Sequence, residues 1–106
     1  MAKYLFEATY TADGTKGLQK EGGTNRSAAV KQMIESLGGE MECFYYTFGK
    51  SDAIVIANVP DNVAAAAAGI AINATGTVQV STTILITPED IDNAVKKSVS
   101  YRPPGA

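Results

Sequence analysis

Alternation of apolar and polar positions predicts four β-strands along this chain. In residues 3–10 one side of the strand carries Tyr4, Phe6, Ala8 and Tyr10, and the other carries Leu5, Glu7 and Thr9. Three further strands are expected at 40–48, 52–59 and 77–87, which are rich in aromatic and β-branched residues. Because only Gly49-Lys50-Ser51 separates the second strand from the third, the two are expected to form an antiparallel hairpin.

Apolar residues at three- and four-residue spacing predict the helices. The first is expected to follow a cap at Thr24 or Asn25 and to end at Gly38-Gly39, since glycine adopts the left-handed terminal conformation at little cost. A second helix is expected from Val63 to Ala74, capped by Pro60-Asp61-Asn62, and a third begins at the Thr87-Pro88 start signal. The glycine-rich residues 11–23 are expected to form a loop with one helical turn.

The predicted order of elements is β-α-β-β-α-β followed by one more helix, which is the ferredoxin-like arrangement of the α+β class. Residues 1–97 are expected to form this domain and residues 98–106 an extended tail. Both long helices should cover one face of a four-stranded antiparallel sheet. The other face then needs a partner chain or a ligand, because a monomer rarely exposes an apolar patch of many hundred Å².

The second strand presents bulky side chains to both faces of this sheet. Two sets alternate along it: Phe44, Tyr46 and Phe48, and Met41, Cys43 and Tyr45. The uncovered face is expected to include either the Phe44 set or the Tyr4, Phe6 and Tyr10 set of the first strand. The sequence leaves that choice open.

Composition narrows the classes of partner. Charged residues make up 19% of the 106-residue chain, against about 25% in typical globular domains. The net charge of -2 provides no field that attracts nucleic acid or an anionic membrane surface. The longest apolar run, residues 63–72, is shorter than the roughly 20 residues of a membrane-spanning helix. We therefore expect neither nucleic acid nor membrane as a partner.

The chain contains no histidine and a single cysteine. It thus lacks the commonest metal ligand and the commonest general acid or base, and no cofactor is expected. Cys43 cannot form an internal disulfide and is expected to be an inert buried thiol. No N-terminal stretch has the pattern of a secretory signal, so the expected location is the reducing cytoplasm.

Four tyrosines, one arginine and one aspartate are the candidate ligand-binding residues: Tyr4, Tyr10, Arg26, Tyr45, Tyr46 and Asp52. Each buried phenol needs a hydrogen-bond partner, so this many tyrosines indicate a pocket or an interface, although ordinary packing also explains them. Asp52 either bonds backbone N–H groups near the hairpin or acts on a ligand. Residues 14–26 either cradle an anion or form a flexible loop at the sheet edge.

Short motifs over nearly the whole chain carry a family resemblance. They are Tyr4-Leu5, Thr11, Gly14, Lys16-Gly17, residues 20–23, Arg26, residues 35–39, Phe44-Tyr45, Phe48-Gly49, Asp52, Pro60-Asp61 and residues 87–89. On these motifs the chain resembles the GYD domain family of small bacterial and archaeal proteins. The resemblance implies a ferredoxin-like fold of the dimeric α/β-barrel kind, in which two sheets pack face to face, and it implies no established reaction. Ser51 replaces the tyrosine of the Gly-Tyr-Asp signature, so a role of that ring does not carry over.

Three functions are compatible with these observations. The favoured one is a small-molecule-binding or regulatory module that forms a homodimer or a higher homo-oligomer through the open sheet face. The second, by fold analogy alone, is a cofactor-independent enzyme similar to the monooxygenases and isomerases of the dimeric α/β-barrel superfamily. The third is a structural assembly subunit whose residues 98–106 clasp a neighbour.

Overall fold

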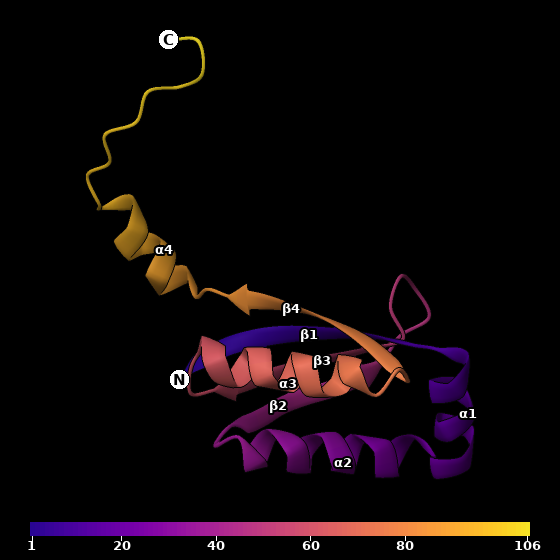
Figure 1. The fold of residues 1–106 in the computed structure, drawn as a ribbon. Coiled ribbons are helices and arrows are strands. Elements are labelled where there is room, and N and C mark those ends of the chain that lie inside the picture. Colours follow the sequence, from indigo (N-terminus) through magenta and orange to yellow (C-terminus); the bar gives the residue numbers. More distant parts are fainter.

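The computed structural model describes all 106 residues and contains one sheet and four helices (Figure 1). In chain order the elements are β1 (Ala2–Tyr10), α1 (Ala12–Glu21), α2 (Gly23–Ser36), β2 (Glu40–Tyr46), β3 (Ala53–Val59), α3 (Asn62–Ala74), β4 (Val78–Leu85) and α4 (Pro88–Val95). All neighbouring strands are antiparallel, in the order β2-β3-β1-β4. The predicted α+β class is confirmed, and the strand order is consistent with a ferredoxin-like fold.

The core lies between one face of this sheet and the helices α2 and α3. Its buried residues are Tyr4, Phe6, Ile34, Val55, Ala57, Val59 and Ala65. Ile34 reaches the sheet from α2, and Ala65 reaches it from α3. The small alanine side chains allow the α3 backbone to approach the strands closely, and both helices therefore cover the same face.

Apart from Phe48, both aromatic sets face the helices, so the expectation that one of them lines the uncovered face is wrong. Phe6 and Phe44 are each paired with Val55 and share its side of the sheet. A bulge between Met41 and Cys43 also moves Met41 to this side, because one extra residue reverses the alternation. Phe48 lies beyond the end of β2 and is fully exposed.

The open face of the sheet carries a different set of side chains. Strand register places on it Lys3, Leu5, Glu7, Thr9, Cys43, Tyr45, Ile54, Ile56, Asn58, Gln79, Ser81, Thr83 and Leu85. Leu5, Ile54 and Ile56 occupy its middle and are only partly buried. No helix of this chain packs over them (Figure 1).

Residues 12–21 form a helix of ten residues and not the predicted loop. Thr11 begins α1: its Oγ1 accepts from the N–H of Gly14 at 3.3 Å, and its own N–H donates to the carbonyl of Thr77 at 3.0 Å. Gly22, with φ of 86°, separates α1 from α2. Because α2 begins at Gly23 without a side-chain cap, the predicted caps at Thr24 and Asn25 are wrong.

The other predicted helix ends are confirmed. Gly38 has φ of 80° and donates its N–H to Glu35, while Gly39 donates to Ile34, as in a Schellman motif. The carboxylate of Asp61 caps α3 by accepting from the N–H of Ala64 at 2.9 Å. Thr87 caps α4 by accepting from Asp90 at 3.1 Å.

Helix α4 lies beyond the end of β4, away from the core, and residues 96–106 continue from it without helix or strand (Figure 1). We refer to α4 and residues 96–106 together as the C-terminal arm. None of the helices combines the length with the apolar character needed to cross a bilayer.

Candidate functional site

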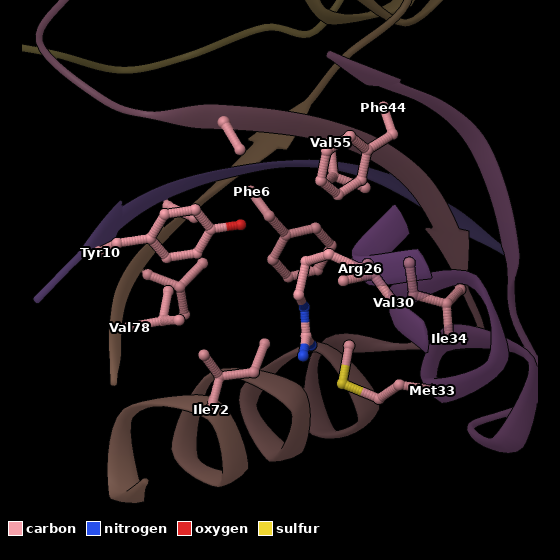
Figure 2. Close-up of a pocket in the computed structure, with 13 residues that line it drawn as sticks. Phe6, Tyr10, Arg26, Val30, Met33, Ile34, Phe44, Val55, Ile72 and Val78 are labelled. Atoms are coloured by element: carbon pink, nitrogen blue, oxygen red, sulfur yellow. The ribbon is translucent and has the colours of Figure 1, made fainter. Parts of the chain in front are cut away.

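An apolar cavity of about 60 Å³, here called the inner cavity, lies between the sheet and the helices (Figure 2). Twelve of its thirteen lining residues are hydrophobic, and Arg26 is the exception. Its lining consists of Phe6, Ala8, Tyr10, Arg26, Val30, Met33, Ile34, Phe44, Ala53, Val55, Ile72, Val78 and Val80. The volume is less than half of the roughly 150 Å³ that accommodates a benzene ring in an apolar cavity. The inner cavity therefore suits a short aliphatic group.

A second and more polar cavity of about 240 Å³, the outer cavity, lies at the same end of the molecule. It is lined by Tyr10, Asp13, Gly14, Gly17, Leu18, Glu21, Arg26, Ile72, Thr75, Thr77 and Val78. Four of these residues, Tyr10, Arg26, Ile72 and Val78, also line the inner cavity. The two cavities thus adjoin, and a molecule can place an apolar part in one and a polar part in the other.

Arg26 is the cationic group of this site. It lies in the first turns of α2, and its side chain points into the inner cavity (Figure 2). Its Nη1 is 3.7 Å from Oε2 of Glu21, an ion pair too long for a hydrogen bond. The guanidinium makes no side-chain hydrogen bond within the chain, and 37% of the Arg26 side chain is accessible. Its fork of N–H donors is therefore available to a planar anion such as a carboxylate.

Tyr10 forms the boundary between the two cavities. As the last residue of β1 it donates its backbone N–H to Oδ2 of Asp52 at 2.8 Å. Burial, with a further contribution from Tyr46, raises the pKa of the Tyr10 phenol to about 12. The phenol is consequently protonated at neutral pH, and its hydroxyl acts as a neutral donor or acceptor, not as a base.

Tyr46 links the sheet to the start of α2. Its hydroxyl donates to the backbone carbonyl of Gly23 at 3.0 Å, and its ring stacks edge-on against Phe44 with centroids 5.0 Å apart. A Cβ on Gly23 would lie 3.1 Å from the Tyr46 ring, so the absence of a side chain there permits this close approach. Burial raises the pKa of Tyr46, while Tyr10 and the charge of Arg26 oppose the rise.

Asp52 contacts the backbone of Tyr10 and lines neither cavity. Besides accepting from Tyr10, it donates its own backbone N–H to the carbonyl of Ala8 at 2.8 Å. These two bonds fasten the end of β1 to the start of β3. Asp52 therefore acts on the site by positioning the strand that carries Tyr10, and its hydrogen-bond partner is distant in sequence.

The remaining candidates lie apart from the cavities. Tyr4 is buried in the core, and its hydroxyl donates to Oδ1 of Asn62 at the start of α3. Tyr45 is 64% exposed on the open face of the sheet. Of the six residues selected from sequence, the structure thus places Tyr10 and Arg26 in the lining of both cavities. Tyr46 and Asp52 adjoin Tyr10 but line neither cavity.

Sequence reasoning missed most of the outer cavity. Asp13, Leu18 and Glu21 come from α1, and the reading of residues 11–23 as a loop concealed their common orientation. The available signal was the Thr11 cap with Asp13 in the first turn and Lys20 in the last, which is the charge order of a helix. Nowhere in the structure do three or more carboxylate or thiol groups gather as metal ligands.

Comparison with known proteins identifies one match. The family model described as GYD domain matches residues 4–95, which include every strand and helix of the fold except the first two residues of β1. No curated protein and no solved structure matches the chain significantly.

Proposed function

This chain belongs to the GYD domain family, and we propose that it is a small-molecule-binding or regulatory module whose ligand occupies the inner and outer cavities. The observation that carries the proposal is the position of Arg26. An arginine with no hydrogen-bonded partner points into a cavity that is otherwise apolar, at the junction with a polar cavity (Figure 2). A cavity with a few polar groups at an apolar wall is the usual form of a small-ligand site.

The two cavities define the class of ligand. A carboxylate in the outer cavity would accept two N–H groups from Arg26 and one hydroxyl from Tyr10. The inner cavity, of about 60 Å³, would take a short aliphatic tail. Asp13 and Glu21 line the outer cavity as well, so a ligand with several negative charges would be repelled. We infer that the ligand is a small aliphatic monocarboxylic acid.

Direct binding tests this inference. Short aliphatic acids such as butyrate and isovalerate, and the matching neutral amides, would be titrated into the ¹⁵N-labelled chain and followed by amide chemical shifts. We expect the acids to shift signals of Tyr10, Arg26 and Val78, and the amides to bind more weakly.

The Arg26→Gln variant removes the charge and should lower affinity at least about tenfold, because a hydrogen bond to a charged group contributes about 1.5–3 kcal/mol. Arg102→Gln is the matched control, since Arg102 lies exposed in the C-terminal arm far from the cavities. Failure of every acid to bind, or equal binding by the Arg26 variant and the control, would contradict the proposal.

The homodimer belongs to the same proposal and rests on the open face of the sheet. Leu5, Ile54 and Ile56 form an apolar strip in the middle of that face, and an ion pair between Lys3 and Glu42 lies beside it. Packing of two such faces would bury the strip in the manner of the dimeric α/β barrels that the family resemblance implies. Sedimentation of the chain should show a dimer at micromolar concentration, and Ile54→Lys should shift it toward monomer. A monomeric unsubstituted chain would remove this part of the proposal.

The enzyme alternative has less support from the site. A cofactor-independent enzyme of this composition would need a tyrosine, aspartate or arginine as its reactive group. The phenol of Tyr10 is held protonated by its raised pKa, and the carboxylate of Asp52 is bonded to the backbone.

A further inference from the structure

The C-terminal arm projects from the body of the molecule (Figure 1). The radius of gyration is 17.0 Å, against about 13 Å for a compact chain of this length. No residue of α4 is buried. Isolated helices shorter than about 12–15 residues are marginal in water, so a helix of eight residues needs a packing partner to persist.

One side of α4 is apolar. Ile91, Ala94 and Val95 lie together on it, and Ile91 and Val95 are 50% and 76% exposed. Val99 and Tyr101 continue the exposed apolar residues into the tail. This stripe has no cover within its own chain.

The charges of α4 are divided along its length. Glu89, Asp90 and Asp92 lie among its first five residues, whereas Lys96 and Lys97 directly follow its last residue, Val95, and still donate their N–H groups to helix carbonyls. At about 100° per residue, Asp90 and Lys97 lie on one side of the apolar stripe, and Asp92 and Lys96 lie on the other. None of these four residues forms an ion pair within the chain.

We propose that the α4 helices of two copies of this chain pack antiparallel to each other. In such a pair, related by a two-fold axis, Ile91 faces Val95 of the second copy. Asp90 then faces Lys97, and Asp92 faces Lys96, and each of these pairs occurs twice because the contact is isologous. A parallel arrangement would instead place like charges opposite each other. The charge order therefore favours the antiparallel over the parallel orientation, and a second copy supplies the complementary charges on both sides of the stripe.

This contact is separate from the open sheet face and from the two cavities. A pair of eight-residue helices is a small interface. A dimer formed through the sheets would strengthen it, because the dimer raises the effective concentration of the two arms. The arm would then join neighbouring copies into the final assembly.

Charge reversal in the full chain tests the proposal. Asp90→Lys/Asp92→Lys leaves Glu89 as the only acidic residue beside four lysines, and Lys96→Asp/Lys97→Asp leaves the helix and its end with acidic residues as their only charged residues. Each variant alone brings like charges together, whereas an equimolar mixture restores every opposite pair. Glu35→Lys/Glu40→Lys is the control for the first variant, since it changes the net charge equally at exposed residues outside the arm.

Mixed ¹⁴N- and ¹⁵N-labelled chains treated with a carbodiimide would report contacts between arms of different chains. We expect cross-links between Asp90 or Asp92 of one chain and Lys96 or Lys97 of the other. Each reversed variant alone should lose these cross-links at least about tenfold, the mixture should regain them, and the control should keep them.

The proposal is overturned if the unsubstituted chain gives no cross-links between arms of different chains. It is equally overturned if the equimolar mixture of the two reversed variants gives no more cross-links between arms than either variant gives alone. Neither outcome depends on ligand binding, so a failure here leaves the cavity proposal standing.

Discussion

Two glycines in the same helix should respond in opposite ways to substitution by alanine. Gly14 and Gly17 both lie inside α1, where alanine is favoured over glycine by about 1 kcal/mol. A Cβ on Gly17 would meet no atom within 4 Å. A Cβ on Gly14 would lie 1.9 Å from the backbone carbonyl oxygen of Thr77. Helix propensity predicts two stabilising changes, but packing permits only one.

The magnitude follows from what must move in the Gly14→Ala variant. The helix would have to retreat by about 1 Å from the Thr77 backbone, which strains the two hydrogen bonds that Thr11 makes to the Thr77 carbonyl. Overpacking costs about 1–3 kcal/mol and each weakened bond about 1 kcal/mol, against the gain of about 1 kcal/mol from propensity. We expect Gly14→Ala to lose roughly 2–4 kcal/mol and Gly17→Ala to gain about 0.5–1 kcal/mol.

Urea unfolding of the two variants and the unsubstituted chain measures this difference. The midpoint should fall for Gly14→Ala and rise for Gly17→Ala at an unchanged m value, and the melting temperatures of the two variants should differ by about 10 °C or more. Equal stabilisation by the two alanines would refute the close approach of α1 to Thr77. Equal destabilisation would show that residues 12–21 are not helical in solution.

Three further predictions concern the core, Asp52 and Tyr10. Ile34→Ala should lower the free energy of unfolding by about 2–5 kcal/mol, because Ile34 is 1% exposed. Ile70→Ala, at a position 71% exposed in α3, should change it by less than about 0.5 kcal/mol. Similar losses for the two variants in urea unfolding would contradict the core assignment. Asp52→Ala should cost about 1.5–3 kcal/mol through loss of the charged acceptor of the Tyr10 N–H, and Asp52→Asn should recover part of it; a loss shared fully by Asn would show that the charge and not the bond matters. The Tyr10 phenol should ionise near pH 12, seen as a step in absorbance at 295 nm that is missing from Tyr10→Phe. Because an unfolded tyrosine ionises near pH 10, the stability that the buried phenol contributes is complete below pH 10 and is lost as the pH rises toward 12. Ionisation of every tyrosine near pH 10 in the folded chain would contradict the burial of Tyr10.

Features that depend on neighbours in sequence were predictable. The alternation of Tyr4, Phe6, Ala8 and Tyr10 with Leu5 and Glu7 identified β1 and grouped its side chains by face, because side chains of a strand point to alternate sides whatever its surroundings. The ends of α2 and α3 followed from Gly38 and Asp61, since a left-handed glycine or a capping carboxylate acts within one turn of the backbone. The same local logic located the start of α4 at Thr87.

Features that depend on distant contacts were not predictable. The sequence did not show that Gly14 packs against Thr77, the residue before β4. This contact holds the glycine-rich helix α1 against the sheet. Nor did the sequence show the bulge after Met41, which depends on how β2 is paired with β3. Arg26 was a weak candidate in sequence because its neighbours there are polar, and it became the centre of the site only when β1 and α3 surrounded it with Tyr10 and Ile72 (Figure 2).

The sequence by itself therefore determined the strands, most helix boundaries and the existence of two apolar sheet faces, because periodicity and capping act over a few residues. The tertiary structure decided which face the helices cover, since the burial of Tyr4 and Phe6 depends on strand register and on the approach of α2 and α3. It also decided that Tyr4 and Tyr45 lie apart from the cavities, while Tyr10 and Arg26 line both of them, with Tyr46 beside Tyr10. Side chains from three separate segments meet there only because the sheet and the helices pack together.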